Sequence, residues 1–484
     1  MNFSAENIGL LLPELIVVAT GALILILDLI LAPRTADEKP RTWLAYVGIA
    51  GLAAAAVANA SLANVHGVLY GGIIIHDALS VFFTFLFLGI GAVALLLAAN
   101  TVPRFSKWGA EYYALVVWCT LGHMVLTSAG EIFTIFITMQ LTSLPLIVLI
   151  GYAKRDPKSG EAALKYLLLV LVSTAVLVYG MSLVYGSLGT STIAEIGTKL
   201  GQLGIVPPAV AVGLVLLLTG FAFKITAAPF HYWVPDTYEG APTPTTAFMS
   251  VGSKFAGFAL ALRIIVTGLK VPMEWALIFG VMAALSMTLG NLGAIKQTNI
   301  KRMLAYSGIA QAGYLLIGVA ALTKAGIAGV LFYAIAYSFA NLAAFAVILT
   351  VARTTGSDEI EGFAGLAKRA PLVALAGTIS FLSLAGLPLF AGFMAKFYVF
   401  LSAAQAGLIW LVAVGVINSV ISLYYYLRVV YVMYVQEGET TPLSYDVPVA
   451  VAMAICTAGV VALGLFPEYA LQAAVHAASA LFGG

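Results

Sequence analysis

Charged residues are scarce in this 484-residue chain. Asp, Glu, Lys and Arg together make up 9% of it, where a soluble globular domain carries about 25%. Hydrophobic residues make up 62%, which is more apolar surface than one soluble core can bury. The shortage of charge therefore excludes an ordinary soluble domain. No basic cluster interleaved with aromatic residues is present, so we expect no nucleic-acid partner.

Cysteine and cofactor motifs are equally scarce. The two cysteines, Cys119 and Cys456, are each alone within an apolar run and form no CxxC pair. This pattern lacks the usual zinc and iron–sulfur ligand sets, and we predict that both thiols are buried structural groups. No GxGxxG follows a predicted strand. We therefore expect no cofactor within this chain.

Long apolar runs are what the chain has instead. About 20 apolar residues suffice for a helix to cross a bilayer, and this predicts an all-α polytopic membrane protein with about fourteen transmembrane helices. We expect a single membrane domain over 1–484. The first run lacks a basic flank and a cleavage site, so it is predicted to be a retained helix. The predicted spans are 8–31, 42–63, 79–99, 111–129, 131–152, 161–186, 208–235, 243–267, 274–294, 301–322, 326–352, 373–402, 408–434 and 447–466, with a short interfacial helix over 468–482.

Lysine and arginine gather in alternate loops, and such loops usually face the cytoplasm. The basic residues of the first set of loops are Arg34, Lys39, Arg41, Arg104, Lys107, Lys154, Arg155, Lys158, Lys296, Lys301, Arg302, Arg353, Lys368 and Arg369. The opposite set holds Lys199, Lys270 and Lys324. We therefore expect both termini to lie on the outer, periplasmic side.

Three lysines do not belong to loops. Lys224, Lys254 and Lys396 fall in the middle of predicted helices. An ionised side chain at mid-membrane costs at least about 2.5–3.5 kcal/mol on insertion scales, and it usually lines an aqueous or proton path. Lys224 lies roughly 24 Å of helical rise into its span, too deep for easy snorkelling. The alternative is that each lysine pairs with a carboxylate and only holds helices together.

Helix-breaking residues accompany these lysines. Pro229 follows Lys224, and Gly386, Pro388 and Gly392 precede Lys396. A break inside a span frees backbone groups, which are tolerated only where protein or water satisfies them. Interrupted helices in corresponding positions of the two halves are typical of transporters built from inverted repeats.

Four stretches carry a family resemblance. They are FHYWVPDTYEGAPTPTTAFMSVGSKFAGFALALR (230–263), SLPLIVLIGYAKRDPKSGEAALKYLLL (143–169), GNLGAIKQTNIKRMLAYSGIAQAGYLL (290–316) and GLPLFAGFMAKFYVF (386–400). With them the chain resembles the N-type antiporter-like subunits of NADH-quinone oxidoreductase, respiratory complex I. The resemblance runs along nearly the whole chain. The sequence motifs GEAALKY and YEGAPTP favour the N type over its L- and M-type relatives and over antiporter-complex subunits.

The resemblance implies two inverted repeats, helices four to eight within 111–267 and helices nine to thirteen within 274–434, with helices seven and twelve discontinuous. It implies that Lys224 is a pumping lysine and Lys254 a connecting lysine. Lys396 corresponds to a terminal lysine that exchanges protons with one side of the membrane. Lys165 matches a family lysine on helix six, and it either joins this path or snorkels to the nearby loop.

Two departures from the family pattern bear on this path. Gln140 stands where the family usually carries a glutamate, and an amide cannot supply the charge that would tune Lys224. Glu131 is about 13 Å of helical rise earlier, too far to substitute. His123 either compensates as a protonatable group or is simply hydrogen-bonded in the core. Gln311 stands where a histidine is common. The chain therefore either pumps protons through a different set of residues or pumps them less effectively.

The polar residues near the first break allow two interpretations each. His231 is either a proton relay, since histidine titrates near neutral pH, or a fixed hydrogen-bond partner of the interrupted backbone. Asp236 and Glu239 either gate the cytoplasmic mouth or cap and solvate the link. Glu14 and Asp28 are expected to contact a neighbouring subunit.

The sequence thus predicts a proton-translocating membrane-arm subunit in the inner membrane of a bacterium. The resemblance implies that NAD, FMN, iron–sulfur clusters and quinone are bound by partner chains, and that the neighbours are M-, K- and J-type subunits and lipid. The first alternative is a cation/proton antiporter subunit, which shares the buried lysines. The second is a non-pumping scaffold, suggested by Gln140. A channel or carrier for a small metabolite is more distant.

Overall fold

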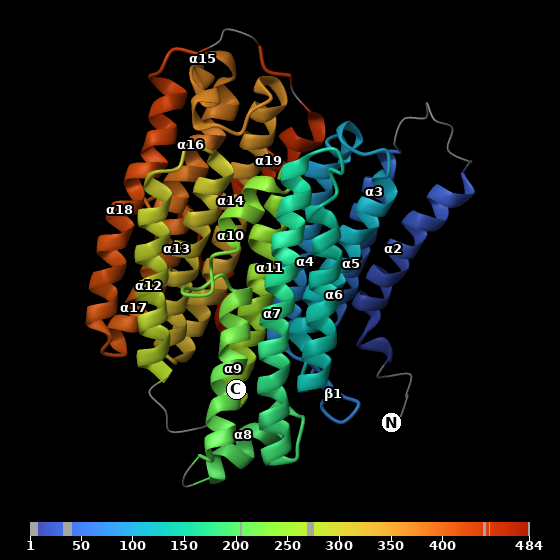
Figure 1. Ribbon diagram of the computed structural model, residues 1–484, viewed down its shortest axis with the longest axis vertical. Helices are drawn as coiled ribbons and strands as arrows, with labels where there is room; N and C mark the ends of the chain where they lie inside the picture. The colour runs from blue at the N-terminus through green and yellow to red at the C-terminus, as the bar shows by residue number, and fades with distance from the viewer. Residues whose placement is uncertain are drawn as a thin grey trace. The chain divides into compact units, whose positions relative to one another are not determined.

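The computed structural model describes residues 8–31, 41–203, 206–268, 275–438, 442–444 and 446–482. These residues are mostly helical (Figure 1), because a bilayer core requires backbone groups to be satisfied within the chain. In the described ranges, eleven helices are long and apolar enough to cross a membrane, and α9 and α16 are shorter apolar helices. The all-α polytopic fold is confirmed, whereas the number of spans stays a prediction. The chain forms two compact units.

The first unit comprises residues 1–225, 252–274 and 476–484. Within it α5 packs against α2, α4 and α6, and α7 runs beside α9 (Figure 1). Its helices are α2 (Leu12–Ile30), α3 (Trp43–Ser61), α4 (Ala78–Ala99), η1 (Val102–Arg104), α5 (Gly109–Ser128), α6 (Ile132–Ile150), α7 (Pro157–Leu188), α8 (Ile193–Gln202), α9 (Pro208–Lys224), the later part of α11 (Thr243–Arg263) and the π-helix η2 (Ile264–Gly268).

A hairpin precedes α4 and was not expected from the sequence. Strand β1 (Gly67–Leu69) pairs antiparallel with β2 (Ile74–His76), with Val68 opposite Ile75. The backbone of Ile74 also bridges to Ala129 at the end of α5. Three residues per strand give too short an alternation to be recognised in an apolar chain, so the pairing depends on contacts distant in sequence.

The second unit comprises residues 226–251 and 275–475. Within it α14 packs against α16, α17 and α19, and α12 runs beside α13 (Figure 1). Its helices are α10 (Val234–Gly240), the first part of α11, α12 (Trp275–Ile295), α13 (Ile300–Ala320), α14 (Lys324–Thr355), η3 (Ile360–Phe363), α15 (Leu366–Arg369), α16 (Pro371–Ala385), α17 (Ala391–Gln405), α18 (Ile409–Tyr434), α19 (Val447–Leu465) and most of α20 (Glu468–Ser479).

Two predicted spans are interrupted. The span predicted over 208–235 contains α9, which ends at Lys224, and the beginning of α10, which starts at Val234. The span predicted over 373–402 contains α16, which ends at Ala385, and α17, which begins at Ala391. The prediction of two discontinuous helices is therefore confirmed.

Other expectations remain predictions. The assignment of 111–267 and 274–434 as inverted repeats requires the two units to be compared in one frame, and each unit is described by itself. The placement of both termini on the outer side also stays a prediction. Arg34, Lys39 and Lys270, used for the orientation, lie outside the described residues. The predicted tail helix over 468–482 corresponds to α20.

A buried ion pair joins three elements of the first unit. Arg263, at the end of α11 and 2% exposed, donates two hydrogen bonds of 2.8 and 2.9 Å to the Asp77 carboxylate. Its Nε donates to the Thr127 carbonyl of α5 at 2.9 Å. Asp77 also caps α4 by accepting from the Ser80 backbone N–H. Burial alone would raise the pKa of the Asp77 carboxyl, but Arg263 and Ser80 hold that pKa below its ordinary value of 3.8.

Removal of this arginine tests the importance of the pair. We expect Arg263→Met to destabilise the protein by about 3–5 kcal/mol, because the Asp77 charge is left buried without its partner. Adding Asp77→Asn should recover part of the loss, since the amide still caps α4 without a charge. Thermal unfolding in detergent at neutral pH measures this loss of stability, with the exposed Arg155→Met as control. Equal losses in the single and double variants would contradict the expectation.

The pH dependence of stability follows from the same pair. Because the Asp77 pKa is lowered, the contribution of the pair to stability should be lost only as the pH falls through that lowered pKa.

Candidate functional site

Lys224 ends α9 inside the first unit and is 4% exposed. Its Nζ donates hydrogen bonds to the hydroxyls of Thr142 and Ser143 on α6, both at 3.0 Å. The Thr142 hydroxyl donates to the Met139 carbonyl at 2.8 Å, which leaves its lone pairs for the lysine. In the described part of the chain, the Lys224 ammonium therefore has hydroxyl partners and no carboxylate within ion-pair distance.

Lys254 lies on α11 in the same unit and is 1% exposed. One turn later, Gly257 allows α11 to approach the Lys224 side chain. A Cβ at Gly257 would lie 3.1 Å from the Lys224 Cγ and 2.9 Å from the Ile225 Cγ2. The aliphatic stem of Lys224 thus packs against the helix that carries Lys254.

Cys119 and His123 on α5 extend this cluster. The Cys119 Sγ donates to the Thr142 carbonyl at 3.2 Å and lies 3.8 Å from the His123 Nε2. His123 is 1% exposed, and its ring is tilted against Phe87 with centroids 5.2 Å apart. The structure therefore brings His123 close to the residues that bind Lys224. The burial of Cys119 agrees with a structural thiol.

The other residues considered for the first half lie apart from Lys224. Glu131 is the N-cap residue of α6, roughly 16 Å of helical rise before Thr142. Its carboxylate accepts from the hydroxyls of Ser191 at 2.6 Å and Thr134 at 3.3 Å. Gln140 is half-buried on α6, and among the described residues no hydrogen bond joins it to Lys224.

Lys165 also lies apart from this cluster. It is on the exposed face of α7, with its Nζ 2.8 Å from the carboxylate of Glu161 one turn earlier. Its membership of the proton path stays a prediction.

Lys396 lies on α17 in the second unit, next to the second helix interruption, and is 4% exposed. Its Nζ donates to the Ala385 carbonyl at 2.8 Å and lies 4.3 Å from the centre of the Tyr314 ring. The last carbonyls of a helix have no partner in the helix itself, so the ammonium satisfies one that the interruption frees. The ring face adds a cation–π attraction.

Gln311 connects the same interruption to a buried group of tyrosines. Its Nε2 donates to the Leu384 carbonyl at 2.9 Å and to the Tyr426 hydroxyl at 3.3 Å. Its Oε1 accepts from the Tyr333 hydroxyl. An amide does not titrate, so Gln311 fixes this network without exchanging a proton of its own.

Of the polar residues after the first interruption, the two acids have definite partners. His231 is half-buried and lies in the chain between α9 and α10, and both of its interpretations stay predictions. Asp236 and Glu239 of α10 both accept from the Arg302 Nη1, at 2.7 and 3.0 Å. The N-cap of α10 is Trp233, so neither acid caps that helix.

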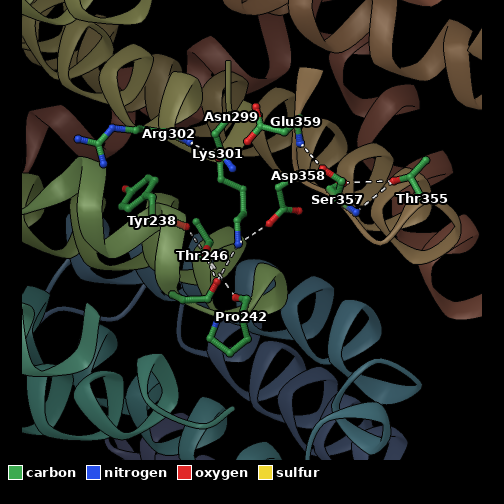
Figure 2. Close-up of polar contacts among 11 residues, drawn as sticks. Tyr238, Pro242, Thr246, Asn299, Lys301, Arg302, Thr355, Ser357, Asp358 and Glu359 are labelled. Carbon is green, nitrogen blue, oxygen red and sulfur yellow. Dashed lines mark hydrogen bonds and ion pairs between the residues drawn. The ribbon is translucent and has the colours of Figure 1, made fainter. Parts of the chain in front are cut away.

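Lys301 was counted with the loops, but the structure places it in the first turn of α13 with 5% exposure. Its Nζ lies 2.9 Å from the Asp358 carboxylate and donates to the Ala241 carbonyl at 3.1 Å (Figure 2). One signal in the sequence was available. Two successive cations after the capping residue Asn299 stand where the helix dipole disfavours positive charge, which implies acidic partners.

The described residues contain no group of three or more His, Cys, Asp or Glu side chains that could hold a metal ion. The two sites instead consist of single buried amines surrounded by hydroxyls, carbonyls and aromatic rings. Chemically, such an arrangement can hold and transfer protons.

Gly386 tests how tightly the Lys396 site is built. Its φ is +89°, and a Cβ there would lie 2.8 Å from the Lys396 Cδ. Gly407 is the matched control, with φ +81° and no atom within 4 Å of such a Cβ. We expect Gly407→Ala to cost about 1–2 kcal/mol for the left-handed backbone. Gly386→Ala should cost about 1–3 kcal/mol more, from overpacking. Thermal unfolding in detergent compares the two, and equal losses would show that Lys396 moves aside freely.

Comparison with known proteins gives the same assignment as the sequence motifs. A family model described as NADH:quinone oxidoreductase/Mrp antiporter, transmembrane, matches residues 129–422. The NADH-quinone oxidoreductase subunit N of Trichlorobacter lovleyi is 41% identical over 480 residues, covering 98% of both chains. The NAD(P)H-quinone oxidoreductase subunit 2 of Nostoc sp. is 45% identical, covering 90% of this chain and 84% of that protein.

Solved structures agree. A chain of respiratory complex I from Thermus thermophilus with bound aureothin is 30% identical, with a TM-score of 0.79, covering 95% of this chain and 98% of that chain. A chain of the Mrp complex from Dietzia sp. is 22% identical with a TM-score of 0.86, covering 99% and 98%, and shows the shared fold. The chain is thus an integral membrane protein, and it belongs to the antiporter-like membrane subunits of NADH-quinone oxidoreductase, together with the proteins named subunit N.

Proposed function

We propose that this chain translocates protons across a bacterial inner membrane as a subunit of the membrane arm of NADH-quinone oxidoreductase. The observation that carries the proposal is the burial of three lysines inside helices of an apolar chain. Lys224 and Lys396 are each 4% exposed, and Lys254 is 1% exposed. A scaffold gains nothing from desolvated amines that each cost free energy to insert, whereas a proton path requires them.

The partners of Lys224 support a proton-exchanging role. A serine or threonine hydroxyl can accept a hydrogen bond from an ammonium, and a hydroxyl with a free hydrogen can donate to a neutral amine. The Thr142 hydrogen is used by the Met139 carbonyl, so Ser143 is the hydroxyl that can reverse its bond. The site can therefore remain hydrogen-bonded in both protonation states. An arginine at this position would not release its proton.

The partners of Lys396 suggest a different step. The Ala385 carbonyl accepts hydrogen bonds but cannot donate one, and the face of the Tyr314 ring attracts a cation. Both favour the ammonium over the neutral amine. In this proposal, a displacement of α16 relative to α17 at the interruption weakens both contacts and accompanies release of the Lys396 proton. This fits the terminal role that the family resemblance implies.

Lys254 and His123 complete the proposed path on the Lys224 side. The packing of the Lys224 stem against Gly257 supports a connecting role for Lys254 on the same helix. His123, near Lys224 through Cys119 and Thr142, is the group we propose as the replacement for the glutamate absent at Gln140. We keep Lys165, Glu131 and His231 as further candidate members of the proposed proton path.

The energy for transport comes from the rest of the complex. Moving one charge against 100 mV costs about 2.3 kcal/mol, and in this proposal the chain itself carries out no redox chemistry. NAD, FMN, iron–sulfur clusters and quinone belong to other subunits in this proposal, and the membrane neighbours are of the M, K and J types. Both termini face the outer side.

Replacement of Lys224 tests the proposal directly. In membrane vesicles with a confirmed intact complex, we expect Lys224→Ala to lower NADH-driven proton pumping by about tenfold or more, because no other amine occupies its place in the path. Quinone reduction, if coupled, should fall with it. The control is Lys324→Ala, at the exposed start of α14. Pumping at the wild-type level in an assembled Lys224→Ala complex would favour the scaffold alternative.

Sodium dependence separates the antiporter alternative, which the shared family model keeps open. We expect NADH-driven pumping to be the same when sodium is replaced by choline, because the described sites contain amines rather than the oxygen cages that hold alkali and alkaline-earth cations. Sodium transport in vesicles without any quinone reaction would contradict the proposal.

A further inference from the structure

Two adjacent cations at the beginning of α13, Lys301 and Arg302, contact different segments of the second unit, and Figure 2 shows the contact of Lys301 with Asp358. Lys301 binds the Asp358 carboxylate at 2.9 Å and the Ala241 carbonyl at 3.1 Å. Arg302 binds Asp236 and Glu239 of α10 at 2.7 and 3.0 Å. The start of α13 is therefore tied both to the link between α10 and α11 and to the segment after α14.

The two attachments differ in kind. The segment after α14 is fixed to α13 through the backbone: the Ile300 N–H donates to the Asp358 carbonyl and the Ile360 N–H to the Thr298 carbonyl, both at 2.8 Å. Asn299 and Glu359 form a β-bridge. By contrast, α10 and its link to α11 pack against α13 and are hydrogen-bonded to it through charged side chains, with Lys301 at the Ala241 carbonyl and Arg302 at α10. The hydrogen-bonded part of this attachment therefore depends on two cationic side chains.

The two side chains do not contribute equally. The Lys301 side chain is 6% exposed, whereas that of Arg302 is 30% exposed. Solvent screening weakens exposed pairs to about 0–1 kcal/mol, while a buried amine that loses its partner is strongly destabilising. Loss of the Lys301 contacts should therefore cost more stability than loss of the Arg302 contacts, because the buried Lys301 ammonium binds both Asp358 and the Ala241 carbonyl.

Each segment held by Lys301 leads to one helix interruption. The link at Ala241 follows α10, which begins just after the first interruption, at 225–233. The segment at Asp358 continues through η3 and α15 into α16, which ends at Ala385, the carbonyl that binds Lys396. A single buried amine is therefore the common contact of the two chain segments that adjoin the interruptions.

We propose that Lys301 is a positioning residue that, paired with Asp358, couples the two helix interruptions. It takes no proton itself in this role. It fixes the α10–α11 link relative to the segment that leads to α16, so a displacement at one interruption is transmitted to the other. The inference deepens the proposed function and rests on it, because the coupling matters only if both interruptions take part in transport.

The test uses the assembled complex in vesicles with Lys301→Ala, Lys301→Arg and Asp358→Asn. The control is Lys296→Ala, an exposed lysine five residues earlier. Pumping, NADH-driven quinone reduction and amide hydrogen exchange over 234–243 are measured together. We expect Lys301→Ala and Asp358→Asn to speed exchange over 234–243 by about tenfold, since loss of a buried contact promotes local opening. We also expect at least about a twofold loss of protons pumped per NADH oxidised. Lys301→Arg should restore much of both, and Lys296→Ala should change neither.

Hydrogen exchange separates this proposal from the proposed function. Lys224→Ala should abolish pumping while leaving exchange over 234–243 unchanged. If Lys224→Ala keeps full pumping, the proposed function fails, and the exchange measurement still decides whether Lys301 holds the link. Unchanged exchange in Lys301→Ala overturns the inference. So does faster exchange with an unchanged number of protons per NADH, because the contact would then be structural only. If Lys301→Ala does not assemble, Asp358→Asn with Lys301→Arg gives the same comparison.

Discussion

A bilayer leaves every buried polar group to find its partner within the protein, and this constraint shapes both lysine sites. At the second interruption, the end of α16 exposes carbonyls that the helix no longer satisfies, and the Lys396 ammonium takes up the one at Ala385. The same interruption therefore creates the binding site for the amine. A break and a charge that would each be costly alone therefore stabilise one another.

At the first site, hydroxyl groups rather than a backbone carbonyl satisfy the buried ammonium. Lys224 is held by the hydroxyls of Thr142 and Ser143, whereas the family resemblance implies a glutamate at the nearby position 140. A carboxylate would hold the amine in its charged form, whereas hydroxyls accept both forms. The glutamine at position 140 is therefore compatible with a working proton site. The charge of Lys224 must then be tuned by something other than an adjacent acid, and Cys119 and His123 lie next to Thr142, one of the residues that bind it.

Much of the architecture followed from local sequence. A run of about 20 apolar residues has to be a helix in a membrane, so the positions of the helices and of the two breaks could be predicted from Pro229, Gly386 and Pro388. The buried lysines were recognisable because a charge in such a run has no local explanation. The hairpin at 67–76 was missed, because three-residue strands leave no periodic pattern. Lys301 was counted with the basic residues of a loop, although the residue is 5% exposed.

The sequence by itself determined where most helices form, where two of them break and that Lys224, Lys254 and Lys396 are buried, since each of these depends on residues adjacent in the chain. Only the tertiary structure decided what those amines touch. Lys224 and Thr142 are 82 residues apart, and Lys301 and the Ala241 carbonyl are 60 apart. Such partners are chosen by how helices pack, because a buried ammonium binds whichever acceptor the neighbouring helix presents at its depth. That choice separates a hydroxyl site at Lys224 from an ion pair at Lys301, although the sequence shows a lysine at both.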